Sequence, residues 1–117
     1  MKKIINLTPR VLNFPGEVAI LPTAPPARVM VSRLEDVKLE TEHGEIQVYV
    51  PAFGSVENLP DYEKGTFLVV SALVRNHPDV KDRIDLLSPG APIRDEHGTL
   101  IGADGVDASR SIGWSVK

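Results

Sequence analysis

The sequence has 117 residues, a formal net charge of −3, 42% hydrophobic and 25% charged residues, and no cysteine. These values predict one compact folded domain over residues 1–117 and argue against wholesale disorder. The lack of cysteine excludes disulfides, thiolate zinc sites and cysteine nucleophiles. The small negative charge argues against binding to a nucleic-acid polymer or an anionic membrane.

Neither the N-terminus nor the longest apolar run is typical of a targeting or membrane segment. The opening MKKIINLTPR has two lysines, but its apolar run is far too short for a signal peptide. The apolar region over residues 67–74 is interrupted by Ser71 and is too short to cross a bilayer. We therefore expect a soluble, cytoplasmic protein.

Short β-strands dominate the predicted elements, because ten prolines and nine glycines leave little room for long helices. The expected strands cover residues 3–7, 17–21, 28–34, 45–50, 66–70, 84–87 and 99–101. The strand at 28–34 alternates as a half-buried strand does. Residues 54–65, GSVENLPDYEKG, are predicted to form a polar loop, and Trp114 in the low-periodicity tail is expected to pack on the body of the domain.

Two turns share the tripeptide Glu-His-Gly, at residues 42–44 and 96–98. In each, glycine supplies the positive φ that a hairpin loop needs. A shared metal role for His43 and His97 is conceivable, but nothing here has metal-ligand spacing, so ordinary turns with their tips in water are favoured. We assign no metal ligand.

The stretch TFLVVSALVRNHPDVKDRIDLLSPG, residues 66–90, predicts a strand, a short helix and a second strand. Its first strand is almost continuously apolar, as in a strand covered on both faces. The thirteen residues from Ser71 to Arg83 suffice for a crossover between parallel neighbours. Ser71 is the expected helix N-cap, and Pro78 ends the helix. The predicted fold class is therefore α+β, with mostly short strands in a mixed sheet and one short crossover helix.

Several polar groups follow these strands where they end. If the two strands are parallel, Ser71 and residues 88–90 emerge at the carboxyl edge of the sheet, where ligands of open α/β sheets gather. Thr8 and Arg10 join them if the first strand lies beside residues 66–70. The candidate ligand-binding residues are Thr8, Arg10, Ser71, Arg75, Asn76, Ser88, Gly90 and Arg94. The alternative is that Ser71 is only a cap, Ser-Pro-Gly only a turn and Arg75 only a solvated helix residue.

No motif in the sequence specifies a reaction. A Walker loop, a dinucleotide glycine fingerprint and HExxH are all missing. General acid–base chemistry by His77, which is close to Asp79, or by His97 is the remaining enzymatic possibility, and sequence spacing alone does not place a base against a substrate. No catalytic residue and no cofactor is assigned.

Three segments in order resemble a group of small phage and prophage proteins that open with an I-N-L-T-P-H sequence. They are I-N-L-T-P at residues 5–9, G-T-F-L-V-V-S-A-L-V at 65–74, and the S-P-G…I-R-D-E-H-G-T-L-I-G region at 88–102. The resemblance covers roughly two-thirds of the chain and is weakest over residues 11–60. Arg10 stands where the group usually has histidine.

The resemblance implies a phage accessory protein acting in the host cytoplasm, and it implies no particular chemistry. Small phage proteins without enzyme motifs often bind a host defence component or a defence signal, which is frequently a nucleotide; this is reasoning by association. Our first hypothesis is therefore sequestration of a small anionic, nucleotide-type signal. The alternatives are a protein-binding inhibitor that uses strand edges or the 54–65 loop, and a small phosphodiesterase-like enzyme. Unprotected strand edges also favour a homodimer or higher homo-oligomer.

Overall fold

The computed structural model describes residues 2–110 and 112. Trp114, with its expected packing, lies outside the described residues. Within this range the protein is built mainly from strands and contains very little helix. The fold is therefore mainly β, and the predicted α+β class holds only in the loose sense that a crossover helix accompanies a mixed sheet.

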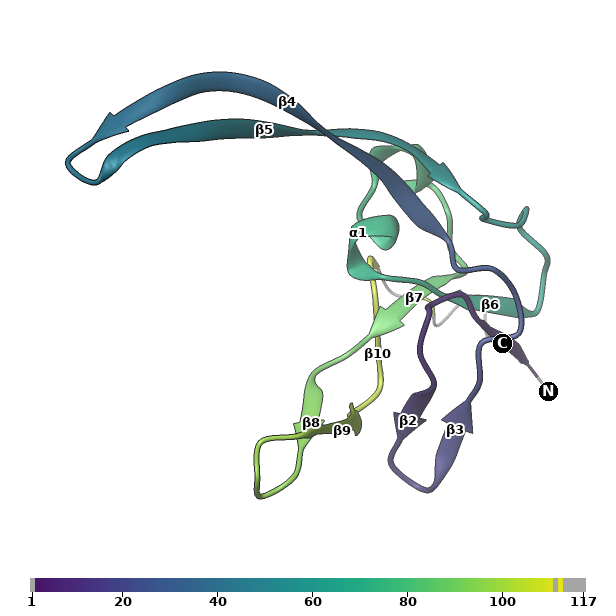
Figure 1. Cartoon of the computed structure of the whole chain (residues 1–117). Coiled ribbons are helices and arrows are strands. Elements are labelled where there is room, and N and C mark those ends of the chain that lie inside the picture. The colour runs from purple at the N-terminus through teal and green to yellow at the C-terminus, as the bar shows by residue number, and fades with distance from the viewer. Residues whose placement is uncertain (1, 111, 113–117) are drawn as a thin grey trace.

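A four-stranded sheet forms the centre of the body (Figure 1). Its strands lie in the order β1 (Lys3–Asn6), β6 (Thr66–Val69), β7 (Leu86–Pro89) and β10 (Val106–Ala108). The first three are parallel neighbours, and β10 is antiparallel to β7. Because β1 lies beside β6, the condition under which Thr8 and Arg10 were expected at the carboxyl edge is met.

The crossover from β6 to β7 also has the predicted form. Ser71 caps helix α1 (Ala72–Arg75), and its Oγ accepts a hydrogen bond from the amide of Val74 at 3.3 Å. A 3-10 turn (Pro78–Val80) follows, and the chain then enters β7 in parallel with β6. The thirteen-residue spacing was thus a correct indication of a parallel crossover.

The sheet is buried on both faces because β6 is apolar at successive positions. Leu68 and Val70 pack with Val74, Val80 and Leu86, under the crossover. The other face of the sheet forms a second cluster with residues from neighbouring elements. That cluster comprises Leu12, Phe67, Val69 and Leu87, with Phe14, Ile20, Ala108 and Ile112 packed against it. Alternation along one strand therefore supplies two cores.

Three hairpins extend from this body. They are β2 (Leu12–Phe14) with β3 (Val18–Ile20), β8 (Pro92–Arg94) with β9 (Leu100–Ala103), and β4 (Arg28–Thr41) with β5 (Gly44–Glu57). The two Glu-His-Gly turns are confirmed as hairpin tips. Gly44 and Gly98 have φ of +123° and +81°, a region that L side chains rarely adopt.

The hairpin of β4 and β5, hereafter the arm, is much longer than the sequence indicated. Each strand has 14 residues, whereas the pattern predicted strands over only 28–34 and 45–50. The predicted polar loop over residues 54–65 is wrong in its first part, because residues 54–57 belong to β5. A search for apolar runs does not detect the full strands, because they contain charged residues such as Glu35 and Lys38, and also Pro51. An exposed antiparallel hairpin accommodates such residues.

The base of the arm is fixed to the body by packing and by one histidine. Val29 is buried in the core, and Val56 packs against it. The Nε2 of His77 lies 2.8 Å from the carbonyl oxygen of Gly54, and its Nδ1 accepts a hydrogen bond from the Asp79 amide at 3.1 Å. Nε2 therefore holds β5 against the crossover, while Nδ1 caps the 3-10 turn of the crossover.

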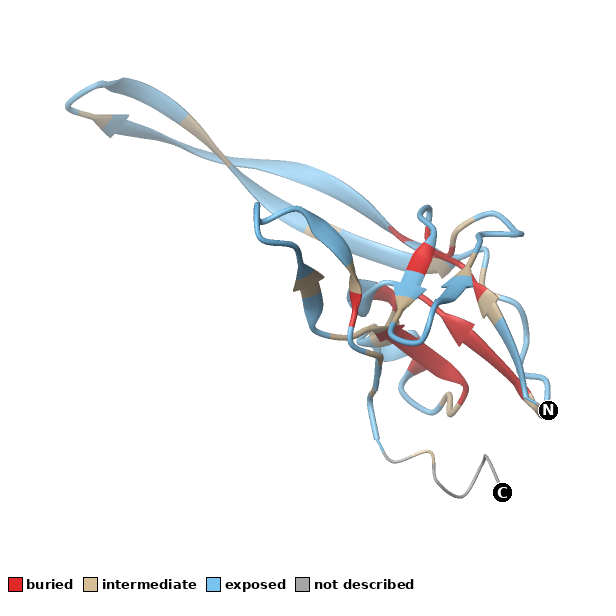
Figure 2. Cartoon of the chain, turned by 90° about the horizontal axis from the view of Figure 1, so that it is seen from below, coloured by how far each residue is buried: buried red, intermediate tan, exposed pale blue. Residues whose placement is uncertain are grey.

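Beyond its base the arm leaves the body, as Figure 1 shows. The molecule measures 59 × 39 × 25 Å and has a radius of gyration of 18.0 Å. A compact domain of this length would have a radius of gyration of about 13 Å. Figure 2 shows buried residues gathered in the body and exposed residues along the arm. Among the described residues, no helix is both long and apolar enough to cross a membrane.

Candidate functional site

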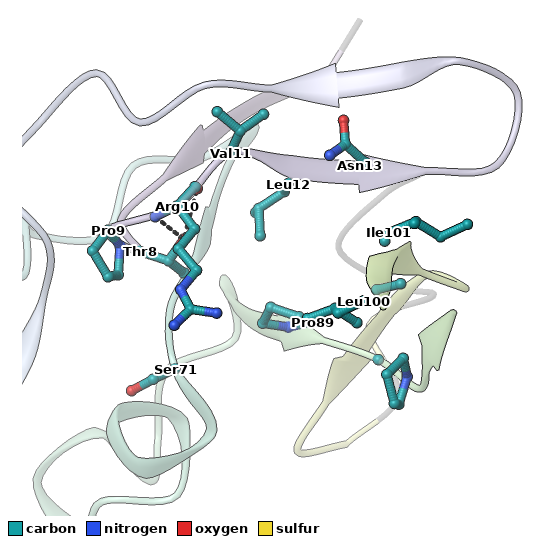
Figure 3. A pocket seen from close by; sticks show the side chains of 14 residues that line it. Thr8, Pro9, Arg10, Val11, Leu12, Asn13, Ser71, Pro89, Leu100 and Ile101 are labelled. Atoms are coloured by element: carbon teal, nitrogen blue, oxygen red, sulfur yellow. Dashed lines mark hydrogen bonds between the residues drawn. The ribbon is translucent and has the colours of Figure 1, made fainter. Parts of the chain in front are cut away.

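A pocket of about 470 Å³ opens at the carboxyl edge of the parallel strands (Figure 3). The loop after β1, Ser71 after β6, and the end of β7 form one side of it, while β2 and β9 form the other. Its walls are largely apolar and include Leu12, Pro89, Leu100 and Ile101. Both its size and its composition are typical of sites for small organic ligands.

Arg10 supplies the positive charge of this pocket. Its side chain extends towards the space between Ser71 and Pro89 (Figure 3). The guanidinium has no hydrogen bond or ion pair with any residue that the structure describes. An exposed, unpaired guanidinium beside apolar walls can donate two parallel hydrogen bonds to a phosphate or carboxylate.

The loop that presents Arg10 is shaped by the buried side chain of Asn6. Its Nδ2 donates to the carbonyl oxygens of Arg10 at 2.6 Å and Ile20 at 2.9 Å. Its Oδ1 accepts from the amide of Thr8 at 2.9 Å and from the Thr8 hydroxyl at 2.6 Å. Asn6 thus satisfies several backbone groups of a chain reversal at once, as a buried amide must if it is not to cost stability.

Four of the eight predicted ligand residues line this pocket: Thr8, Arg10, Ser71 and Gly90. They come from the ends of three parallel strands, which is the arrangement that the carboxyl-edge argument anticipated. The Ser71 oxygen accepts a hydrogen bond from the Val74 amide as the cap of α1, and in Figure 3 it points away from Arg10 and Pro89. The buried Thr8 uses its hydroxyl to hold the loop.

The structure does not bring the other four candidates to the pocket. Arg75 donates through Nε to the buried Ser88 hydroxyl at 2.7 Å and through Nη1 to the Ser109 hydroxyl at 3.0 Å. The bond between Arg75 and Ser88 therefore joins the crossover to the sheet. Asn76 is the C-cap of α1.

Arg94 belongs to the tip of a hairpin and not to the edge of the sheet. It donates to the carbonyl oxygen of Gly98 at 3.1 Å and so stabilises its own turn. Asp95 stabilises the same turn, since it accepts from the amides of His97 and Thr99.

Sequence reasoning missed the apolar walls and Asn6. Leu12 lies in β2, and Leu100 and Ile101 lie in β9; no local pattern indicated that these two strands flank the end of β1. Asn6 lies inside the predicted first strand, where a polar residue between apolar neighbours was the one available signal.

Close packing of β9 against β2 sets one boundary of the pocket. A Cβ atom added at Gly102 would lie 2.6 Å from the carbonyl oxygen of Asn13. Because that neighbour is backbone, Gly102→Ala is expected to push the two strands apart and to destabilise the fold by about 1–3 kcal/mol. Urea denaturation would measure the change. Gly105→Ala is the control, since no heavy atom lies within 4 Å of a Cβ at that position, and equal losses in both variants would contradict the packing argument.

The three histidines lie away from the pocket lining. His43 and His97 are at the tips of two different hairpins, each beside its preceding glutamate, at 3.3 Å and 3.5 Å. No group of three or more His, Asp or Glu side chains arranged to hold a metal occurs within residues 2–110 and 112. His77 and His97 are therefore not placed for acid–base chemistry on a ligand in this pocket.

Comparison of this chain with protein-family models, with curated proteins and with solved structures found no match.

Proposed function

We propose that the protein binds a small anionic ligand of nucleotide type in the pocket beside Arg10 and sequesters it. The observation that carries this proposal is the Arg10 guanidinium, which pairs with no described residue and lies at an apolar pocket of about 470 Å³. The arginine suits a phosphate or carboxylate, and the apolar walls suit the flat face of a base. The resemblance to phage proteins extends the proposal to a biological role, the removal of a nucleotide-derived defence signal from the host cytoplasm.

The arrangement favours binding over turnover. The residues that line the pocket supply the guanidinium of Arg10, the hydroxyls of Thr8 and Ser71 and the side-chain amide of Asn13. Among the described residues of this lining, none is a histidine or a carboxylate that would act as a general base. Arginine and amide groups bind an anion through hydrogen bonds without cleaving it, which is what a sequestering protein requires.

Thermal unfolding in the presence of a nucleotide panel tests the proposal directly. A ligand at a hundredfold excess over its Kd stabilises the folded state by about 2.7 kcal/mol, which raises the Tm measurably. Mass spectrometry of the ligand recovered from the complex then separates binding from catalysis. Intact ligand supports sequestration, whereas cleaved ligand would support the phosphodiesterase alternative. A panel without any stabilising compound would count against a nucleotide ligand.

Arg10→Ala is expected to weaken binding of the ligand so identified by about 1.5–3 kcal/mol, the range for a charged hydrogen bond. Arg10→Lys should restore only part of the loss, because a lysine cannot form the bidentate contact. Calorimetric titration measures both.

Arg94→Ala is the matched control for this titration, because Arg94 is also an exposed arginine and bonds its own turn outside the pocket. It should bind the ligand as the wild type does. Equal affinities for wild type and Arg10→Ala would remove Arg10 from the site, and a loss confined to Arg94→Ala would move the site to the β8–β9 hairpin.

A further inference from the structure

Arg10 carries the one formal charge among the described residues that line the pocket. The other lining residues are neutral, and most of them are apolar. Two further arginines do not add to this charge, because both are bonded to the protein outside the lining. Arg75 donates to Ser88, and Arg94 donates to the carbonyl oxygen of Gly98. The described lining therefore offers a ligand a single positive charge.

A carboxylate lies directly behind the wall of the pocket at Gly90. Asp104 follows the lining residue Ala103, and its Oδ1 accepts a hydrogen bond from the amide of Ala91 at 2.9 Å. The backbone holds it there as well, since the Asp104 amide donates to the carbonyl oxygen of Ala91 at 2.9 Å. A Cβ atom added at Gly90 would lie 2.6 Å from the Asp104 Oδ1, so the carboxylate contacts this wall. The wall at Gly90 therefore bears a fixed negative charge.

The two opposite charges belong to different parts of the pocket and do not neutralise each other. Arg10 lies in the loop after β1 and extends towards the space between Ser71 and Pro89 (Figure 3), while Asp104 follows β9. Arg10 forms no ion pair with Asp104. A negative group beside the guanidinium is attracted, whereas a second one that reaches Gly90 meets the carboxylate. Like charges at such close range repel, and apolar walls strengthen the repulsion because they lower the local dielectric constant.

We infer that the pocket selects a nucleotide with a single negative charge, carried by one phosphodiester group, as in a cyclic nucleoside monophosphate. This inference rests on the proposed function and names the class of its ligand. One guanidinium balances the charge of one diester, and its planar fork matches two phosphate oxygens. A phosphomonoester carries about 1.5–2 negative charges at pH 7, and a triphosphate carries more, so their excess charge has no cationic partner in the described lining.

The volume of the pocket agrees with one nucleoside and one phosphate. At about 470 Å³ it lies in the lower half of the range for small-molecule sites, roughly 300–1,000 Å³. Apolar side chains from opposite walls, among them Leu12 of β2 and Pro89 of β7, can pack against the two faces of a base (Figure 3). A cyclic dinucleotide would bring a second base and a second diester, for which the described lining supplies no further cation.

Calorimetric titration of the full chain, with ligands that share a base and differ in charge, tests the inference. For each common base the series comprises the nucleoside, its cyclic monophosphate, its simple monophosphate and its triphosphate, in buffer without divalent metal. The cyclic monophosphate should bind most tightly, and the simple monophosphate more weakly. The triphosphate should bind at least about 10-fold more weakly than the cyclic compound, because its added charges are repelled near Gly90. The nucleoside should also lose at least about 10-fold, because it leaves Arg10 without a partner.

The series separates this inference from the proposed function. A triphosphate or simple monophosphate that binds as tightly as the cyclic monophosphate would overturn the single-charge inference and leave a nucleotide pocket in place. A series in which no compound binds would contradict the proposed function itself, and the inference with it.

Asp104→Asn tests the assigned source of the selection. The asparagine keeps an oxygen for the Ala91 amide and removes the negative charge, so the triphosphate should gain about 3–10-fold in affinity relative to the cyclic monophosphate. Asp107→Asn is the matched control, because Asp107 is an exposed carboxylate of β10 outside the pocket lining, and it should leave this ratio unchanged. An unchanged ratio in Asp104→Asn, or an equal change in both variants, would remove Asp104 from the selection.

Discussion

Arg83→Ala is expected to lower the free energy of unfolding by about 3–5 kcal/mol, because it leaves a buried carboxylate without its partner. Asp85 is 2% exposed, and both of its oxygens accept from Arg83, at 2.8 Å from Nε and 2.7 Å from Nη2. The same Nη2 donates to the carbonyl oxygen of Pro60 at 3.0 Å and so holds the loop that follows the arm. Asp85 in turn is fixed to β6 through its own carbonyl oxygen, which accepts from the Leu68 amide.

Urea denaturation of the full chain measures this loss, and two further variants show its cause. Lys81→Ala removes an exposed positive charge two residues away and should change stability by no more than about 0.5 kcal/mol. The double variant Arg83→Met with Asp85→Leu should be more stable than Arg83→Ala alone, since replacing both members of a buried pair by apolar groups leaves no unpaired charge. A double variant less stable than the single one would show that an unpaired Asp85 carboxylate is not what destabilises Arg83→Ala.

The centre of the fold was predictable because its signals are local and strong. The apolar run at 66–70, the cap at Ser71 and the length of the crossover each constrain the chain independently, and all three are consistent with two parallel strands. The two Glu-His-Gly turns were predictable for a similar reason, since only glycine readily adopts the positive φ that those tips require.

The arm was not predictable because its order depends on pairing and not on local pattern. Alternation stops at the register shift near Asp36, where one extra residue reverses the apparent face of everything that follows. Pro51 further weakens the strand signal, although an edge strand tolerates proline where the amide would face solvent. A search for short alternating runs therefore detects two fragments instead of one long hairpin.

The candidate site was half predictable. Strand-end logic placed Thr8, Arg10 and Ser71 together because their strands are parallel neighbours. The position of a residue at a strand end does not show whether its side chain lines the pocket or bonds to other parts of the body. Arg75 shows the limit, since its guanidinium is taken up by two serines from β7 and the chain after β10. Tertiary contacts of this kind have no signal at the level of spacing.

Asn6→Ala is expected to destabilise the fold by about 3–5 kcal/mol, the cost of leaving several buried polar groups without partners. Asn6 is 0% exposed, and its amide group bridges the carbonyl oxygens of Arg10 and Ile20 while accepting from Thr8. Asn6→Asp should be at least as damaging, because a carboxylate oxygen would then face two carbonyl oxygens in a buried site. Chemical denaturation followed by circular dichroism measures both variants.

Thr8→Val is the matched control for Asn6→Ala, because it removes the hydroxyl that bonds Asn6 while keeping the Thr8 amide in place. Its loss should be about 1–2 kcal/mol and smaller than that of Asn6→Ala, because the hydroxyl bonds the Asn6 oxygen and the backbone of Arg10 only. Below their unfolding transitions, the Asn6 variants should also bind the pocket ligand more weakly than Thr8→Val does, since the loop that orients Arg10 loses its main support. An Asn6→Ala protein as stable as Thr8→Val would show that water replaces the amide, and the ordered presentation of Arg10 would then have to come from the packing of Leu7 and Leu12 instead.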